Sequence, residues 1–241
     1  MIIPVKVPFT VTADMTKYAG PAFNSNPDSA YLQQKKEELD TYGDEICATL
    51  GGRDELVQQL GDYCGVKEKK DISSIAMQLE EDVAILHQGK LVSICFCFPS
   101  GFVPRSKLGM IFFDMHLPVA DGNILRAASE KVTKLISREG SSFRRYVWTI
   151  TSLSGLSQHP AYTRPQPHCI SDLYFRTETQ TTVGLANEIC LFFVKVEMKP
   201  FESIWDDNDQ RKLVLESINS MSESVLDYKN LHKVKEILNR S

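Results

Sequence analysis

The middle of the chain contains a run of apolar, β-branched segments separated by short turns, and this pattern limits the fold more than any other feature. DVAILHQ and KLVSICFCF flank Gly89, as the strands of a β-hairpin do. Further strands are predicted at GMIFFDMH, RRYVWTITSL, DLYFRTETQ and EICLFFVKVEMKPF. Because hairpins and loops connect most of these segments, the sequence predicts an antiparallel sheet in an α+β fold.

Helices are expected on both sides of this strand-rich segment. After an irregular start, helix-forming residues run from Ser29 to Gly51, with Ser29 or Asp28 as the cap. The segments GRDELVQQLGDYCG, SSIAMQLEED, DGNILRAASEKVTKLISRE, QRKLVLESINSMSESVLDYK and LHKVKEILNRS each predict a further helix. We expect one domain over residues 1–241, with helices at about 1–80, a β-rich core at about 81–200 and helices at about 201–241.

Composition excludes several classes of protein. The formal net charge of −4, without a Lys/Arg cluster, disfavours a nucleic-acid partner. No window approaches the roughly 18 apolar residues of a membrane span, so no membrane partner is expected. The first 20 residues lack the long apolar stretch of a secretory signal, and we therefore expect a cytoplasmic protein.

Six cysteines are scattered along the chain. Cys95 and Cys97 follow a C-x-C spacing, which is not the C-x-x-C of zinc or redox motifs. In a chain of this length without a signal segment, we expect them to be reduced thiols in the core rather than members of a disulfide framework.

The predicted strand DLYFRTETQ has an unusual polar face. Arg176, Glu178 and Gln180 are two residues apart, so on a strand they lie on one side of the sheet. This face is either a solvated outer surface, which is common in antiparallel sheets, or the wall of a pocket in which Arg176 and Glu178 position a polar ligand or move protons.

Histidine is the other candidate for chemistry. His116 closes the predicted strand GMIFFDMH just before Pro118, where an imidazole is either structural, a metal or haem ligand, or a base. His159 and His168 lie in a Pro-rich loop. No H-x-H, H-E-x-x-H or Cys/His cluster indicates zinc, and no glycine-rich nucleotide-binding loop is present.

Several segments in order are similar to one known family. They are QLEEDVAIL, ICFCFPSGFVPRSKLG, MHLPVADG, RRYVW and LYFRTETQ, running from about Gln78 to Gln180. In this order and spacing the chain resembles the haem-binding alpha-type subunit of the haem-dependent oxidative N-demethylases. The resemblance implies a PAS-like fold with a curved antiparallel sheet, haem b as cofactor, and O2-dependent oxidation of a small methylated amine with release of formaldehyde. It also implies a flavin and iron–sulfur reductase as the electron-donating partner.

The resemblance also assigns roles to residues of this chain. His116 occupies the place of the family's I-H-x-P-V histidine and is the leading axial haem ligand, with His168 and His159 as the fallback ligands. Arg145 and Trp148 match the R-x-N-W segment; Arg176, Glu178 and Gln180 match R-x-E-R-Q. These matches imply that Glu178, Arg145 and Arg176 serve catalysis and that His116, Trp148 and Gln180 contact the cofactor.

The sequence departs from the family pattern around this site. Val147 stands where the family has asparagine, and Thr179 where it has the second arginine. Arg145 and Trp148 are an odd number of residues apart, so a regular strand without a bulge places them on opposite faces. The departures leave two alternatives open beside an enzyme: a haem- or ligand-binding sensing module that does not turn its ligand over, and an interaction protein with a filled core.

Overall fold

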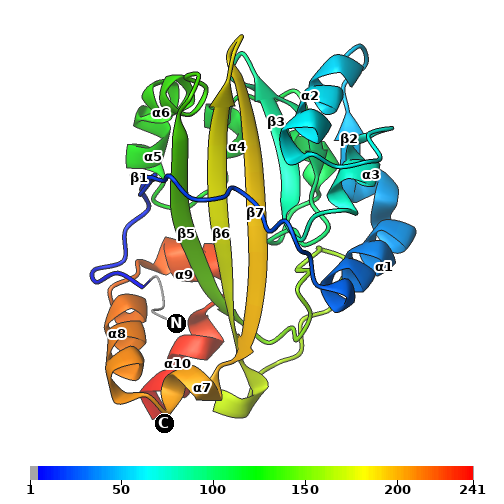
Figure 1. The fold of residues 1–241 in the computed structure, drawn as a ribbon. Coiled ribbons are helices and arrows are strands. Elements are labelled where there is room, and N and C mark those ends of the chain that lie inside the picture. The colour runs from blue at the N-terminus through cyan, green and yellow to red at the C-terminus, as the bar shows by residue number, and fades with distance from the viewer. Residues whose placement is uncertain (1–4, 241) are drawn as a thin grey trace.

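The computed structural model describes residues 5–240, and its centre is one antiparallel sheet with the strand order β1-β5-β6-β7-β3-β4-β2. Figure 1 shows the three long strands β5, β6 and β7 side by side, with helices grouped beside both ends of the strand order. The α+β class and the antiparallel sheet are confirmed. The strands are β1 (Thr16–Lys17), β2 (Cys47–Thr49), β3 (Asp82–His87), β4 (Lys90–Cys95), β5 (Ser142–Thr151), β6 (Tyr174–Leu185) and β7 (Ile189–Pro200).

Tight turns set the register of the sheet. The predicted hairpin of β3 and β4 is confirmed, and Gln88 and Gly89 in its turn have φ values of 50° and 75°. Two successive residues with positive φ make the turn whose twist matches that of the paired strands. The β6–β7 hairpin pairs all twelve residues of each strand, from Tyr174 opposite Pro200 to Leu185 opposite Ile189.

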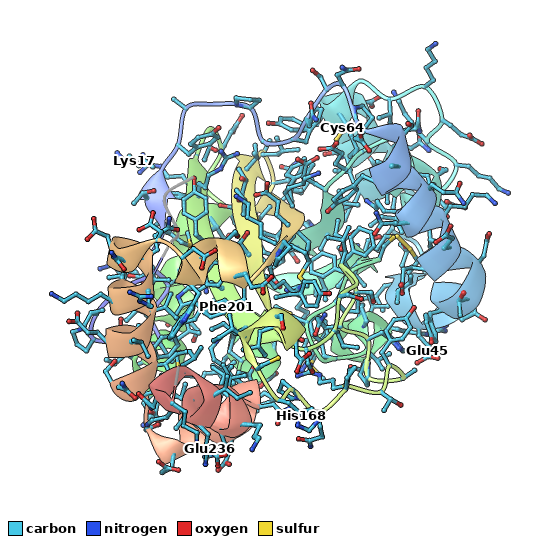
Figure 2. The ribbon with its side chains drawn as sticks, turned by 90° about the horizontal axis from the view of Figure 1, so that it is seen from below. Lys17, Glu45, Cys64, His168, Phe201 and Glu236 are labelled. Carbon is cyan, nitrogen blue, oxygen red and sulfur yellow. A yellow bond between two sulfur atoms is a disulfide. The ribbon has the colours of Figure 1, made fainter. Side chains whose placement is uncertain are left out.

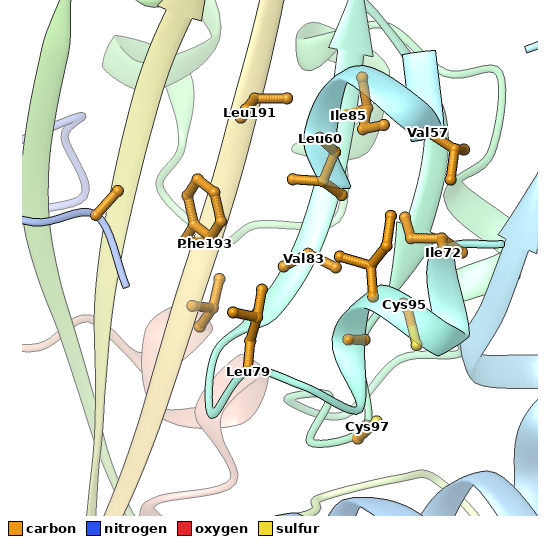
Figure 3. Close-up of a cluster of buried hydrophobic side chains, with 14 of the residues drawn as sticks. Val57, Leu60, Ile72, Leu79, Val83, Ile85, Cys95, Cys97, Leu191 and Phe193 are labelled. Atoms are coloured by element: carbon orange, nitrogen blue, oxygen red, sulfur yellow. The ribbon is translucent and has the colours of Figure 1, made fainter. Parts of the chain in front are cut away.

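The N-terminal helices cover one face of the sheet and build the larger core. They are α1 (Ser29–Ile46), capped by the side chain of Asp28, α2 (Asp54–Cys64) and α3 (Ile72–Ala76). Figure 3 shows their apolar side chains against those of β3 and β7, and burial of each such side chain stabilises the fold by about 1.5–3 kcal/mol. The labelled members are Val57, Leu60, Ile72, Leu79, Val83, Ile85, Cys95, Cys97, Leu191 and Phe193.

The opposite face is covered by the segment between β4 and β5. It contains the short helices η1 (Pro104–Lys107) and α4 (Phe112–Met115), then α5 (Asn123–Ala127) and α6 (Ser129–Ile136). Val132 and Ile136 of α6 pack on Leu86, Phe143 and Cys190 of the sheet.

The C-terminal helices pack on the lower part of β5 and β6 around a second core, which contains Trp148, Phe175 and Phe201. They lie beside the outer strand β5 in Figure 1, and a one-turn helix, η2 (Ile170–Asp172), precedes β6. The C-terminal helices are α7 (Glu202–Trp205), α8 (Asn208–Asn219), α9 (Glu223–Lys229) and α10 (His232–Arg240).

Five predictions about local structure were wrong. The N-terminal helix ends at Ile46, and the chain then forms β2 instead of continuing to Gly51. The helix predicted at 121–139 is divided into α5 and α6 at Ala128, and the one predicted at 210–229 is divided into α8 and α9. Residues 16 and 17, in a stretch expected to be irregular, pair with β5. The first four residues of that stretch lie outside the described part.

The fifth and most important correction concerns GMIFFDMH, which is not a strand. Only residues 109–111 approach β4, through two hydrogen bonds with Leu91 (Leu91 N to Met110 O, 2.9 Å; Gly109 N to Leu91 O, 2.8 Å) and one bridge. Farther along, β4 already pairs with β2 and β3 on its two sides, so no edge is left for another strand. The chain therefore turns into α4, and His116 caps the end of that helix.

The cysteine prediction was also wrong in part. Cys47 and Cys95 face each other on β2 and β4 and form a disulfide, with Cα atoms 4.1 Å apart. The prediction missed this pair because it did not foresee β2. Cys97 is a free thiol in the core, as expected.

Candidate functional site

The polar residues of β6 lie on one buried face of the sheet. Arg176, Glu178 and Gln180 share that face, as the spacing predicts, and Val147 and Arg145 of β5 pair with Glu178 and Gln180 respectively. Arg176 is 2% exposed and Glu178 9% exposed. The face is therefore not the solvated outer surface that the pattern also allowed.

The Glu178 carboxylate is held from two sides. Arg176 Nη1 donates to Oε1 at 2.5 Å, and Gln180 Nε2 donates to Oε2 at 2.7 Å. Burial raises the pKa of Glu178, but the charges of Arg176 and Arg145 and these hydrogen bonds outweigh burial and hold it below the ordinary 4.5. The site thus contains a fixed negative charge at neutral pH.

Arg176 is itself anchored to loops that follow other strands. Its Nη2 donates to the carbonyl of Phe98 at 2.8 Å, and its Nε donates to the carbonyl of Leu156 at 3.2 Å. All three nitrogens of the guanidinium are therefore engaged, and its position is determined by the surrounding backbone.

Arg145 differs from Arg176 because its guanidinium has no partner. Its Nε is out of contact with solvent and makes no hydrogen bond, and no ion pair joins the side chain to a carboxylate within the described part of the chain. Burial lowers the pKa of Arg145, while the charges of Glu178 and Asp14 act in the opposite direction. Arg145 is thus a half-buried cation whose buried Nε is an unused hydrogen-bond donor.

His116 has one nitrogen engaged and one available. Its Nδ1 is 2.7 Å from the carbonyl of Phe112, and the ring stacks on the Phe112 ring with centroids 4.1 Å apart. Because a carbonyl only accepts, Nδ1 carries the proton and Nε2 keeps a lone pair. Burial, with the charges of Arg145 and Lys107, lowers the pKa of His116 and favours the neutral ring.

A network around Arg126 fixes the turn that follows His116. Arg126 Nη1 donates to the carbonyls of His116 at 3.3 Å and Val119 at 3.0 Å. A side chain at Gly122 would place its Cβ 2.9 Å from the Val119 oxygen and 2.8 Å from Arg126 Nη1, so glycine is needed for this close approach.

Lys229 belongs to the same site, although the sequence analysis missed it. Its Nζ donates to the carbonyl of Trp148 at 3.0 Å. Burial lowers the pKa of Lys229 to about 8, Glu178 opposes this shift, and Arg145 and Arg176 add to it. A lysine in the last turn of a helix is ordinary, so no local pattern distinguishes this one. Only the packing of α9 beside β5 brings it here.

Three predicted site residues lie elsewhere. Trp148 is on the opposite face of β5 from Arg145, where it stacks on Phe175 with ring centroids 5.6 Å apart in the second core. The parity argument is thus correct, and no bulge brings the indole to Arg145. His159 is buried against α1, stacked on Tyr42, with Nε2 3.5 Å from a Glu45 oxygen. His168 lies at the surface, as Figure 2 shows.

The candidate site therefore consists of His116, Arg145, Arg176, Glu178 and Gln180 from the predicted set, with Lys229 added. Comparison with curated proteins gives no match to this chain. Among the described residues, no helix is both long and apolar enough to cross a membrane. The family model described as haem-dependent oxidative N-demethylase, alpha subunit-like, matches residues 57–239, which include all six site residues. The chain belongs to the haem-dependent oxidative N-demethylase alpha-subunit-like family.

Proposed function

We propose that this protein binds haem b through His116 and uses it in the O2-dependent oxidation of a small methylated amine, with release of formaldehyde. The observation that carries the proposal is the state of His116: Nδ1–H is held by the Phe112 carbonyl, and Nε2 bonds to none of residues 5–240. An imidazole oriented in this way is a ready haem ligand, because a hydrogen bond at one nitrogen fixes the ring and raises the basicity of the other.

The residues fit haem better than a metal ion bound by protein alone. Within residues 5–240, no group of three or more His, Cys, Asp and Glu side chains could hold a metal. A porphyrin supplies four ligands itself, so one imidazole is enough. Arg145 also supports a bound group on this face of the sheet. Its Nε has no hydrogen-bond partner among the described residues, and its positive charge acts on the His116 ring.

Haem, when bound, would supply the activation of O2. The residues of the chain would supply position and charge. His116 would hold the cofactor, and the neutral form of its ring is favoured by burial. Glu178 stays ionised, so it would attract and orient the ammonium form of the substrate rather than take its proton. Arg176 and Gln180 would keep the carboxylate in place.

The proposal further includes a PAS-like identity for the sheet, a cytoplasmic location, and a flavin and iron–sulfur reductase as electron donor. The family match and the antiparallel sheet support the PAS-like identity. The location is inferred from the sequence, and the reductase from the resemblance to the family. They can be examined by a solved structure, by fractionation of cells and by reduction of the haem with purified candidate reductases.

One spectroscopic experiment tests the role of His116. The purified protein is titrated with haem and its Soret band recorded for the unchanged chain and for His116→Ala, His168→Ala and His159→Ala. We expect saturable binding, with a Soret band that shifts or collapses only in His116→Ala. If the Soret band is unchanged in that variant but is lost in His168→Ala or His159→Ala, the haem ligand is the loop histidine and not His116. His87→Ala is the matched control.

A second candidate function is a haem- or ligand-binding module without turnover. It is favoured by one observation: both oxygens of Glu178 are already bonded, and its pKa is lowered, so it is a poor proton acceptor. The haem-loaded protein is mixed with O2, dimethylamine and a reductant other than dithionite, and the formaldehyde released is measured. Stoichiometric haem without formaldehyde would favour the binding module; catalytic formaldehyde would exclude it.

A further inference from the structure

Two cations beside β5 have no carboxylate partner. Arg145 makes no hydrogen bond or ion pair, and the Nζ of Lys229 has one acceptor, the backbone oxygen of Trp148. Other lysines in protected positions are neutralised: Lys35 lies 3.4 Å from Asp82, and Lys195 lies 2.6 Å from Glu80. Arg126 and Arg144 are also half-buried and lack a carboxylate partner among the described residues, but their guanidinium groups are bonded to neutral oxygens. Arg145 has neither a carboxylate nor a neutral acceptor among these residues.

The nearby carboxylates do not correct the imbalance. Both oxygens of Glu178 are bonded to Arg176 and Gln180. Asp14, whose charge also acts on Arg145, pairs with Lys6 at 2.8 Å. Counted together, four cations (Lys6, Arg145, Arg176, Lys229) face two carboxylates (Asp14, Glu178), so this part of the fold has an excess of two positive charges at neutral pH.

An excess of partly buried positive charge destabilises a fold, because the charges lose part of their hydration without gaining a partner. A ligand that brings negative charge removes this cost. The donors are suited to a carboxylate: a guanidinium donates two parallel hydrogen bonds to one, and an ammonium adds a point charge.

We propose that Arg145 and Lys229 together form a carboxylate-binding site on this face of the sheet. Two sources of the carboxylate fit: the propionates of a bound haem, or the carboxylate of an N-methylated amino acid as substrate. Both sources rest on the proposed function, but binding of a free carboxylate to the cofactor-free protein does not require it.

The ionisation of Lys229 supports the site. Its pKa of about 8 reflects burial without a counterion, and the groups whose charges act on it are Glu178, Arg145 and Arg176. A bound carboxylate would favour the charged form and raise this pKa. Carboxylate affinity should therefore decrease above about pH 8, and this decrease should disappear in Lys229→Met.

The test uses Arg145→Met and Lys229→Met. The controls are Arg138→Met and Lys212→Met, at an exposed position just after α6 and an exposed position of α8. Each protein is titrated with haem, with haem dimethyl ester, in which both propionates are esterified, and, in the cofactor-free state, with N,N-dimethylglycine and dimethylamine. Binding is measured by absorption for the haems and by thermal shift and calorimetry for the amines. Circular dichroism verifies that each variant is folded.

Each outcome decides between the sources. If haem propionates are the ligand, each site variant weakens haem binding by roughly 10- to 100-fold and leaves binding of the ester unchanged. If a substrate carboxylate is the ligand, the same loss occurs for N,N-dimethylglycine, while haem and dimethylamine bind as before. Equal affinities of variants and controls for all four probes would overturn the proposal. Failure of haem to bind the unchanged protein would instead reject the proposed function, and the dimethylglycine titration would still decide this one.

Discussion

Two buried groups of charges lie on this sheet, and they differ in completeness. Near the start of β3, Lys35 and Asp82 are 0% and 1% exposed. Lys35 Nζ donates to the carbonyls of Leu79 and Glu81 at 3.1 and 2.7 Å, and Asp82 accepts from the amides of Cys97 and Phe98 at 3.0 and 2.9 Å. Beside β5, Arg176 and Glu178 are similarly engaged, but the buried Nε of Arg145 has no partner among the described residues.

This difference indicates a structural role for the Lys35–Asp82 group and a functional role for the group at β5. The Lys35–Asp82 group is closed, since each charge has partners within the protein and none is directed at solvent or at a cavity. It joins α1 to β3. The group at β5 is open, because part of its hydrogen-bonding capacity is unused. Natural folds retain such unsatisfied groups mainly where a ligand or reaction needs them.

The largest expected effect is on stability, and it comes from removing one partner of the Lys35–Asp82 pair. Lys35→Met leaves Asp82 buried without its counterion, and we expect a loss of roughly 3–5 kcal/mol in the free energy of unfolding. Urea denaturation followed by circular dichroism measures it. The double variant Lys35→Met/Asp82→Leu should recover much of the loss. A single variant as stable as the unchanged protein would contradict the structural role.

Arg176→Met tests the closed half of the functional group. It removes three donor nitrogens but leaves Glu178 its bond to Gln180, so we expect a smaller loss of about 2–3 kcal/mol. The carbonyls of Phe98 and Leu156 lose a donor as well. Urea denaturation is again the measurement, and a cost equal to that of Lys35→Met would show that the two groups are equally structural.

Arg145→Met should have the opposite sign. It removes a cation without a partner, so the cofactor-free protein should be unchanged or more stable by up to about 1 kcal/mol. Thermal and urea unfolding are compared with those of Arg138→Met. A destabilisation above about 2 kcal/mol would mean that Arg145 has a structural role, and the contrast with Lys35 would fail.

The smallest expected effect is on the stability of the protein at acidic pH. The pKa of Glu178 is lowered in the fold, so its contribution is present above the ordinary value of 4.5 and is lost as the pH falls through the folded value. Glu178→Gln should therefore show a smaller decrease in stability between about pH 5 and pH 3 than the unchanged protein. The exposed Glu139→Gln is the control, and identical acid curves for Glu178→Gln and the unchanged protein would contradict the pKa shift.

The sheet and the polar face of β6 could be predicted, because both follow from the alternation of side chains along single strands. The spacing of Arg176, Glu178 and Gln180 places them on one face whatever surrounds them. Parity likewise separates Arg145 from Trp148. Alternation along a strand does not show whether a face is buried. That depends on the segments that cover the sheet, so the sequence could not decide between a solvated face and a pocket.

The remaining parts of the site depend on competition between segments. GMIFFDMH has the composition of a strand, but β4 has no free edge for it, and this determines the local environment of His116. Lys229 comes from a helix that packs beside β5, and Asp14 from a segment before β1. Such long-range neighbours leave no mark on the local sequence.

The bond from Lys229 to the Trp148 carbonyl also concerns solubility. β1 pairs with β5 only at Phe143 and Arg144, so the rest of that strand has no neighbouring strand on its outer side. Exposed strand edges invite pairing with another chain. By occupying one of the edge carbonyls with a charged side chain, α9 shields this edge against strand addition, and the same lysine that faces the site helps to keep the protein from aggregating.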